Sequence, residues 1–264
     1  MSKIYAPNFL QPIASDALIR LGNKGDGGYV VPEFLVNKAD SLLSFGMSSD
    51  WSFEEDVTEK NPTIPIHVYD HTVDKRHFWR LFRNALKKFF LLRTTFSDLQ
   101  YKFAKYKSYK NFFQGKNVHF EERVFNRIEQ SYDADIDKIF SRLKEKKACI
   151  VKMDIEGGEY RVINQLLKYE SIISLLIIEF HDTEPLRETF NKNINSICEY
   201  FAIAHIHGNN SSGIAYDGLP DVLEISFINK RIPHSADQGV KEFPILGLDY
   251  PTNPEKPDYP LLFK

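Results

Sequence analysis

Short apolar runs alternate with longer segments of helical periodicity along most of the chain. The runs are rich in β-branched and aromatic residues, whereas the segments between them repeat apolar residues every three or four positions. This alternation predicts parallel βαβ units. We expect strands near 41–45, 64–69, 118–120, 148–153, 175–180, 201–207 and 222–228, and helices over 53–60, 135–145, 160–169 and 185–200.

The loop between the last two predicted strands is short. Its residues, Gly208 to Gly213, cannot hold a crossover helix, so these two strands are expected to run antiparallel. The earlier connections leave room for helices and predict parallel neighbours. The chain is therefore expected to form an α/β fold with a doubly wound, seven-stranded sheet.

The segment 75–116 interrupts this order after the second predicted strand. It contains 12 Lys and Arg residues and one acidic residue, Asp98, a balance of +11 in a chain of net charge −2. The remainder therefore carries −13, which argues against nucleic acid as a partner. Aromatic residues interleave with the basic ones at helical spacing, so a helical insertion is expected.

Three interpretations of this insertion stay open. Its aromatic residues can pack on the body while its lysines cover a solvated face. It can also cap a ligand crevice, where Arg80, Arg83 and Lys87 would hold an anionic acceptor. A membrane-surface helix is the third interpretation and ranks below the cap.

Length and composition favour one domain. We expect 1–264 to form a single domain, with 75–116 as a helical cap insertion and 230–264 as an irregular C-terminal tail that could pack on another subunit of a homo-oligomer. Two cysteines are too few for a disulfide framework, and Met1–Gln11 lacks an apolar core of signal-peptide length. The longest apolar run, Ile172–Ile178, is too short for stable membrane insertion. These features predict a cytoplasmic protein.

The most informative motif follows the predicted strand 148–153. The sequence Asp154-Ile155-Glu156-Gly157-Gly158-Glu159-Tyr160 places acidic side chains and two glycines at a strand end. Ligands of open α/β sheets bind at the carboxyl ends of the strands. The motif therefore predicts a ligand site.

Two other strand ends point to an adenosine cofactor. Gly46 follows the first strand and lets the backbone approach a ligand, but the G-x-G-x-x-G fingerprint of dinucleotide sites is absent. Asp70 ends the second strand, where an acid commonly accepts the hydroxyls of an adenosine ribose.

These motifs together resemble the FkbM family of S-adenosylmethionine-dependent methyltransferases. The motif 154–160 carries the resemblance, and 22–32, 42–46, 207–210 and 220–224 resemble a bacterial subgroup associated with surface-glycan gene clusters. The match runs from about Leu21 to Ile228 without the insertion. The turn after Gly46 departs from the family pattern because it lacks the usual second glycine.

The resemblance implies a Rossmann-like methyltransferase sheet and S-adenosylmethionine as cofactor. It further implies O-methylation of a small acceptor in capsule or surface-polysaccharide modification, and the basic insertion favours an anionic acceptor, phosphorylated or nucleotide-activated. A sulfonium needs carboxylates and aromatic rings around it. We expect the cofactor at Asp26, Tyr29, Phe45, Gly46, Ser48, Asp70 and Asp154, catalysis at Asp154, His181 and His207, and the acceptor at Arg80, Arg83, Lys87, Glu179 and Asn209.

Methylation of an alcohol needs a base, and Asp154 is the first candidate. Glu179, His181, Asp182 and His207 compete with it, although His207 could equally be a hydrogen-bonded structural residue. The same side chains could gather around a divalent ion, but no ligand spacing is diagnostic, so no metal is predicted.

Two functions of other classes remain as alternatives. One is a noncatalytic binding module of a glycan-synthesis complex, in which the insertion would be the docking element. The other is a nucleotide-sugar oxidoreductase, which would need a pyrophosphate loop that this sequence lacks.

Overall fold

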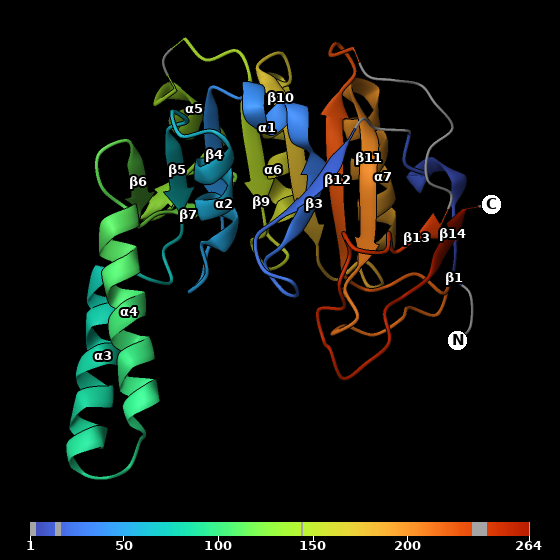
Figure 1. Ribbon diagram of the computed structural model, residues 1–264. Coiled ribbons are helices and arrows are strands. Elements are labelled where there is room, and N and C mark those ends of the chain that lie inside the picture. The colour runs from blue at the N-terminus through green and yellow to red at the C-terminus, as the bar shows by residue number, and fades with distance from the viewer. Residues whose placement is uncertain (1–3, 14–16, 144, 234–241, 264) are drawn as a thin grey trace.

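A seven-stranded β-sheet forms the centre of the protein (Figure 1). The computed structural model describes residues 4–13, 17–143, 145–233 and 242–263. From one edge to the other, the strands are β11 (Phe201–Gly208), β12 (Leu223–Asn229), β10 (Ile173–Phe180), β9 (Cys149–Met153), β4 (Ser41–Phe45), β5 (Ile66–Tyr69) and β6 (Asn117–Phe120).

Within this sheet, β12 is the one strand that is antiparallel to its neighbours. It pairs antiparallel with β10 and β11, whereas the remaining pairs are parallel. The predicted α/β class, the seven strands and the antiparallel last pair are therefore confirmed. Predicted and observed strand ends differ by at most two residues.

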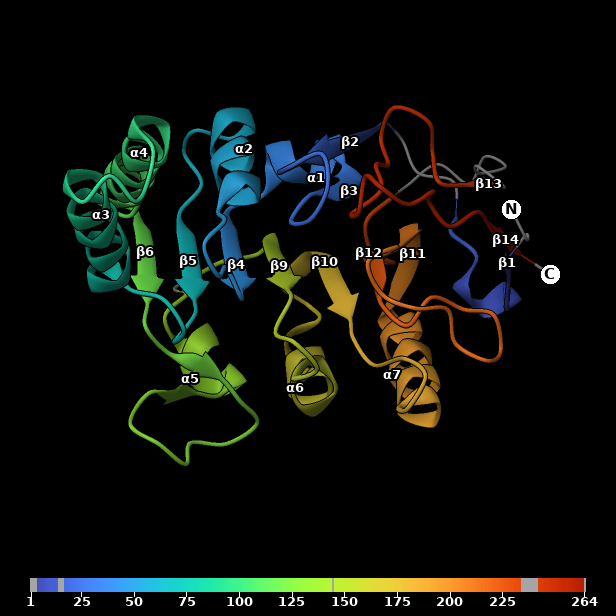
Figure 2. The same ribbon diagram turned by 90° about the horizontal axis from the view of Figure 1, so that it is seen from below.

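Helices cover both faces of the sheet (Figure 2). One face carries α1 (Glu33–Lys38) and α2 (Ser52–Lys60), and the other carries α5 (Ile136–Ser141), α6 (Glu159–Leu166) and α7 (Arg187–Tyr200). Alternate strand residues enter two separate apolar clusters, as Leu42 and Leu43 of β4 do. Burial on both faces explains why the strands read as continuous apolar runs.

The helix predicted over 135–145 is shorter than expected, because α5 ends at Ser141. The last turn of the helix predicted over 160–169 is a separate 3-10 helix, η2 (Leu167–Tyr169).

Several short elements were not predicted. They are β1 (Ile4–Ala6), η1 (Asn8–Leu10), β2 (Leu18–Leu21), β3 (Tyr29–Pro32), β7 (Arg123–Val124), β8 (Asp133–Ala134), β13 (Glu242–Phe243) and β14 (Leu261–Phe263), together with α1. β2 and β3 form an antiparallel hairpin, and β1, β14 and β13 form a small sheet of their own. The tail predicted to be irregular over 230–264 thus contains two short strands. Part of that tail, 234–241 and residue 264, lies outside the described residues.

Buried histidines of β11 tie the tail to the central sheet. His205 Nε2 lies 3.0 Å from Oδ2 of Asp249. His207 is 2% exposed and lies between two carboxylates, with Nδ1 3.1 Å from Oε2 of Glu224 and Nε2 3.0 Å from Asp258. Burial alone would lower the pKa of His207, but the charge of Glu224 and the hydrogen bond with Asp258 raise it well above its usual value.

The insertion is a pair of antiparallel helices, α3 (Lys75–Phe90) and α4 (Phe96–Phe112), which confirms its helical nature. Figure 1 shows that this hairpin extends away from the sheet beyond β6. Aromatic pairs hold the two helices together, with ring centroids 5.3 Å apart for Trp79 and Tyr106 and 5.1 Å apart for Phe82 and Phe103. In the described part of the chain, no helix is both long and apolar enough to cross a membrane.

The base of the hairpin is held by Trp51, the residue that precedes α2. Its ring meets Phe78 of α3 and Tyr109 of α4 edge to face, with centroids 5.4 Å and 5.7 Å away. The Lys105 ammonium lies 4.2 Å from the centroid of the Trp51 ring and 3.9 Å from Oδ1 of Asp50. The hairpin is therefore anchored on the loop that follows β4.

We expect His207→Ala to lower the free energy of unfolding by about 3–5 kcal/mol, because the buried carboxylate of Glu224 and the partly buried carboxylate of Asp258 would lose their cation. The stabilisation by His207 is full below the unfolded-state pKa of histidine and is lost as pH rises through its raised folded-state pKa. The difference between variant and wild type in urea denaturation should therefore shrink at high pH. His71→Ala, at an exposed histidine, is the control; equal losses in both variants would contradict the assignment.

Candidate ligand-binding site

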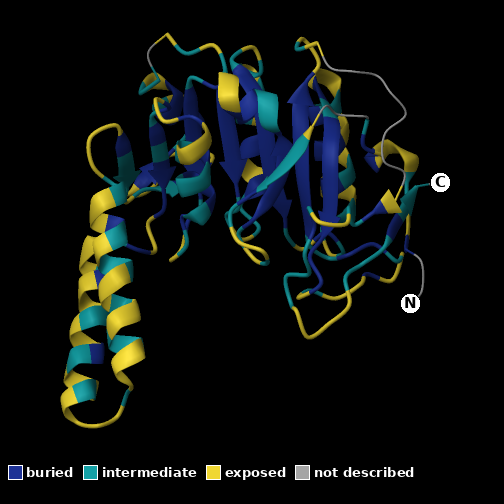
Figure 3. Cartoon of the chain, in the orientation of Figure 1, coloured by how far each residue is buried: buried dark blue, intermediate teal, exposed yellow. Residues whose placement is uncertain are grey.

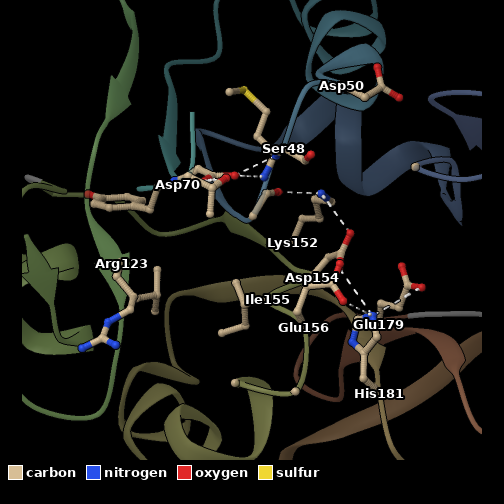
Figure 4. Close-up of a pocket in the computed structure, with 18 of the residues that line it drawn as sticks. Ser48, Asp50, Asp70, Arg123, Lys152, Asp154, Ile155, Glu156, Glu179 and His181 are labelled. Carbon is tan, nitrogen blue, oxygen red and sulfur yellow. Dashed lines mark hydrogen bonds and ion pairs between the residues drawn. The ribbon is translucent and has the colours of Figure 1, made fainter. Parts of the chain in front are cut away.

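A cavity of about 760 Å³ opens at the carboxyl ends of the parallel strands. Loops that follow β4, β5, β9, β10 and β11 line it, which is the place where open α/β sheets bind ligands. Its volume lies within the range of about 300–1,000 Å³ that is typical of small-molecule sites. Figure 4 shows Asp154, Glu156, Glu179 and His181 together at one end and Arg123 at the other.

Gly46 forms the closest approach of two chain segments in this cavity. It adopts φ +80°, and a Cβ atom at this position would lie 1.7 Å from the carbonyl oxygen of Asp154. The Asp154 amide also donates to the carbonyl of Phe45 at 2.9 Å. Only glycine can stand here, because both the backbone angle and the contact exclude a side chain.

Asp70 holds the turn that follows Gly46. Its Oδ2 accepts the backbone amides of Met47 and Ser48 at 2.9 Å and 2.7 Å, and its Oδ1 accepts the amide and hydroxyl of Thr72 at 2.7 Å and 2.6 Å. Burial would raise the pKa of Asp70, but these hydrogen bonds lower it. An ionised carboxylate has about four acceptor positions, and this one already has four donors within the chain.

Lys152 is a buried cation within the apolar strand β9. Its Nζ donates to the carbonyl of Gly46 at 2.9 Å and lies 3.9 Å from Oδ2 of Asp154. The neighbouring Glu54 is buried, which raises its pKa, while the charge of Lys152 opposes this rise. Lys152 thus offsets part of the negative charge of the cavity.

A hydrogen-bonded chain links the ends of β9 and β10. The hydroxyl of Tyr29 lies 3.1 Å from Oδ2 of Asp154 and 3.1 Å from Oε2 of Glu179. The Tyr29 hydroxyl has one proton and can donate it to only one of the two carboxyl groups. The second hydrogen bond therefore needs a protonated carboxyl group that donates to the phenol oxygen. Burial, and then the charge of Asp154, raises the pKa of Glu179 to about 8, so Glu179 supplies that proton at neutral pH.

Asp26 faces the cavity from the loop between β2 and β3. Among the described residues, its carboxylate has no hydrogen-bond or ion-pair partner. Asp26 is exposed as a residue, but partial burial of its carboxylate at the cavity raises its pKa, and the charges of Asp154, Glu224 and Asp50 add to the rise. A cationic ligand group would relieve this repulsion.

His181 follows β10 and is oriented by a buried acid of α6. Its Nδ1 lies 3.1 Å from Oε1 of Glu159, which is fully buried and also accepts the amides of Ile155 and Gly157. Burial alone would lower the pKa of His181, but the bond and charge of Glu159, followed by the charges of Glu179 and Asp154, raise it. At neutral pH, His181 is therefore a cation among carboxylates.

Asp154, Glu156 and His181 could hold a divalent ion, because their ligand atoms lie within 4.8 Å of one another. His181 Nε2 is 3.6 Å from Oε2 of Glu156 and 3.9 Å from Oδ1 of Asp154. Ligands that share an ion at about 2.1 Å lie about 3.0–4.2 Å apart, so this spacing fits. The Glu159 carboxylate on Nδ1 is also the usual outer partner of a metal-bound histidine. Protonated His181 can also balance the negative charge of Asp154 and Glu156 without a metal ion. The absence of a metal therefore stays a prediction.

The other end of the cavity is less acidic. Arg123 of β7 and Arg161 of α6 line it with Val124, Phe125 and Ile155. The Arg123 guanidinium is already paired, with Nε 2.8 Å and an Nη 3.2 Å from the carboxylate of Asp133. This end offers an apolar surface with a planar cation, which suits a flat ring.

The structure brings together most of the predicted site residues. The following line the cavity: Asp26, Gly46, Ser48, Asp70, Asp154, Glu179, His181 and Asn209. Tyr29 lies behind them as the link between Asp154 and Glu179, and Asp182 is exposed beside the site.

Besides Tyr29, five predicted residues do not line the cavity. The side chain of Phe45 is fully buried in the core, and His207 belongs to the network that holds the tail. Arg80, Arg83 and Lys87 are exposed on α3, and the cavity has no lining residue from the insertion. Because α3 extends away from the sheet, these cations do not reach the cavity.

Sequence reasoning missed Lys152, Arg123 and Arg161. Lys152 had a signal, since a lone cation inside an apolar strand needs carboxylate or carbonyl partners. Arg123 lies in a two-residue strand and Arg161 on a helix surface, and neither position differs from an ordinary exposed arginine in sequence.

Sequence comparisons do not assign this chain to a family. No protein-family model matches the chain, and no curated protein matches it. The resemblance to the FkbM family therefore stays a prediction.

Comparison with solved structures gives distant likenesses. A pre-rRNA processing protein fibrillarin of Methanococcus jannaschii is 11% identical, with 74% of this chain and 68% of that chain covered and a TM-score of 0.38. A putative caffeoyl-CoA O-methyltransferase of Staphylococcus aureus is 11% identical, with 75% and 80% covered and a TM-score of 0.38. Human methyltransferase-like protein 13 in complex with SAH is 13% identical, with 79% and 78% covered and a TM-score of 0.40. These likenesses are weak, so the fold assignment rests on the strand order of the chain itself.

We expect Gly46→Ala to abolish ligand binding in the cavity and to destabilise the protein by several kcal/mol more than Gly115→Ala. Both glycines have positive φ, +80° and +69°, so the backbone strain of about 1–2 kcal/mol is matched. A Cβ at Gly115 would have no atom within 4 Å, whereas at Gly46 it would meet the backbone of Asp154. Thermal and urea denaturation measure the difference, and similar losses in the two variants would contradict it.

Proposed function

We propose that this protein is an S-adenosylmethionine-dependent methyltransferase that methylates a hydroxyl group of a neutral, sugar-like acceptor. The observation that carries this proposal is the Asp154–Tyr29–Glu179 chain, which lies beside the Gly46 turn at the carboxyl ends of the strands. It supplies a proton acceptor where a sheet of this strand order binds its ligands.

The cavity fits the charge and shape of the cofactor. S-adenosylmethionine carries a sulfonium and an ammonium group, and the carboxylate of Asp26, which faces the cavity, suits either. The adenine ring would lie toward Ile155 and Arg123, while Gly46 lets the backbone come close. The ribose fits less simply, because a ribose hydroxyl would have to replace one of the four donors of Asp70, of which the Thr72 hydroxyl is the one on a rotatable side chain.

Bound S-adenosylmethionine would supply a methyl group as an electrophile. The residues of the chain would position the acceptor and remove its proton. A hydroxyl against Asp154 can give its proton to the carboxylate as its oxygen forms the new bond to carbon. Tyr29 and Glu179 control how basic Asp154 is, because the Tyr29 hydroxyl donates its hydrogen bond to Asp154 when Glu179 is protonated.

Charge at the acidic end favours a neutral acceptor group. The carboxylates of Asp154 and Glu156 would repel a phosphate that entered beside them, and Arg80, Arg83 and Lys87 are not there to hold it. We therefore place the reacting hydroxyl on a sugar, and any phosphate of a nucleotide-activated precursor outside the acidic end. The resemblance to the FkbM family supports a precursor of a bacterial capsule or surface glycan as the acceptor.

We expect calorimetric titration to show binding of S-adenosylmethionine and of its demethylated product, but not of nicotinamide cofactors. Asp26→Asn should weaken the binding of S-adenosylmethionine about tenfold, because a charge-assisted contact is lost. Glu188→Gln, at an exposed acid of α7, is the charge-matched control and should leave the affinity unchanged.

The other outcomes distinguish the alternatives. Binding of a nicotinamide cofactor alone would favour an oxidoreductase. Failure to bind any of these ligands would leave the noncatalytic module as the better proposal.

We expect methyl transfer to accelerate as pH rises through about 8, where Glu179 loses its proton. Above this pH a single phenol proton is shared by two carboxylates, so Asp154 becomes more basic. Glu179→Gln should remove this acceleration and keep the rate at its low-pH level, because the amide donates to Tyr29 as the protonated acid does.

Transfer of radiolabelled methyl to a panel of free and nucleotide-activated sugars measures the rate, and carbon NMR of the Glu179 carboxyl measures its pKa without an acceptor. Glu188→Gln should keep the full pH profile. If Glu179→Gln also kept it, the relay would be wrong.

A further inference from the structure

The far end of the α3–α4 hairpin exposes a cluster of large apolar side chains. Four residues at or beside the connection between the helices are exposed: Phe90 by 77%, Leu91 by 63%, Leu92 by 93% and Phe96 by 59%. We call these four residues the apolar tip. Seven of the 15 exposed large hydrophobic residues in the described chain lie on this one hairpin, so the surface apolarity is concentrated there.

Hydrogen bonds define the turn at the tip. Arg93 donates its amide to the carbonyl of Lys88 at 2.8 Å, and the Thr95 side chain accepts the amide of Asp98 at 3.1 Å to cap α4. Leu92 adopts φ +57°, a conformation that glycine usually takes at a helix end. The chain thus keeps an exposed leucine where glycine would fit with less strain.

Little of the apolar tip is used for packing within the hairpin. Phe89 meets the rings of Phe90 and Phe96 with centroids 6.2 Å and 5.9 Å apart, yet all four tip residues stay more than half exposed. Phe78, Phe82, Ala85 and Phe89 recur on the face of α3 that meets α4 and the body, and Figure 3 shows the outer surface of both helices as exposed. The tip continues beyond these contacts, at the end farthest from the sheet.

Cations run along the outer side of α3 up to the tip. Arg76, Arg80, Arg83 and Lys87 are all exposed and recur at the spacing of one helical face, opposite the packed face. Lys88 and Arg93 are exposed on either side of the apolar tip. A convex apolar end surrounded by cations is complementary to a layer of anionic headgroups over hydrocarbon.

We propose that the hairpin docks the protein on a membrane surface that contains anionic phospholipids. The apolar tip enters the boundary between headgroups and acyl chains, while Lys87, Lys88 and Arg93 contact the lipid phosphates. A protein partner would need a groove that receives this tip, and a nucleic acid offers no hydrocarbon phase for four adjacent apolar side chains. The lipid surface satisfies both the apolar and the charged parts.

The docked geometry leaves the cavity clear of the membrane. α3 has 16 residues, which corresponds to about 24 Å along its axis. The tip can therefore enter the lipid while the carboxyl ends of the strands stay open to acceptors in the water layer.

The test is co-sedimentation of the full chain with vesicles of 30% phosphatidylglycerol in phosphatidylcholine, against vesicles of pure phosphatidylcholine. We expect at least tenfold stronger binding to the anionic vesicles, decreasing with salt. The triple change Phe90→Ser, Leu91→Ser and Leu92→Ser should weaken binding at least tenfold. Lys87→Glu with Lys88→Glu should weaken it about 25-fold or more on anionic vesicles.

Two control variants make comparable changes at exposed residues outside the hairpin. Tyr216→Ser with Leu246→Ser deletes side chains that are 86% and 101% exposed, and Lys147→Glu with Lys192→Glu makes the same change of charge. Both controls should bind as wild type, and circular dichroism checks that each variant keeps its helices.

Two results would overturn the proposal. One is no binding to anionic vesicles, or binding that the tip variants share with the controls. The other is a dimer, measured by light scattering, that the tip variants dissociate while vesicle binding is unchanged, because a second copy would then cover the tip.

Discussion

The contact between Gly46 and the backbone of Asp154 is the constraint on which the cavity depends. It joins the ends of β4 and β9 so closely that no side chain fits between them. The same turn directs the amides of Met47 and Ser48 onto Asp70 and the carbonyl of Gly46 onto Lys152. One backbone contact therefore fixes where the carboxylate of Asp154 lies and leaves open space beside it.

Charge is the second determinant of the cavity. Acidic side chains outnumber the cations at the end near β10, and burial makes their repulsion stronger. Three features reduce this repulsion. Glu179 and His181 are both protonated at neutral pH, and the Lys152 ammonium lies against the carbonyl of Gly46 beside Asp154. Within the described residues Asp26 still has no hydrogen-bond or ion-pair partner, so the remaining imbalance favours a cationic ligand.

The sequence predicted the central sheet closely because its strands are buried on both faces and read as uninterrupted apolar runs. It failed for β7, β8, β13 and β14, whose two or three residues carry no periodicity. Strand-end residues such as Asp154, Glu179 and His181 were placed correctly at one edge, since parallel strands present their carboxyl ends together.

Sequence reasoning could not place residues whose position depends on tertiary geometry. His207 follows the same strand-end rule as Asn209, yet the tail that covers it with Asp258 comes from 51 positions later in the chain. The basic insertion has the composition of a cap, but composition does not give the direction in which a hairpin leaves the sheet. Packing of Trp51 against Phe78 and Tyr109 sets that direction.

Asp50 lines the cavity, and the Lys105 ammonium of α4 lies 3.9 Å from it, so one loop is shared by the cavity and the hairpin base. A force that tilts the hairpin therefore acts on the cavity wall as well. If occupation of the apolar tip changes the affinity of the cavity for its ligand, thermodynamic linkage requires the ligand to change the affinity of the tip by the same factor. The Asp50 loop is the physical link through which such a coupling would pass, because Asp50 both lines the cavity wall and forms the ion pair at the hairpin base.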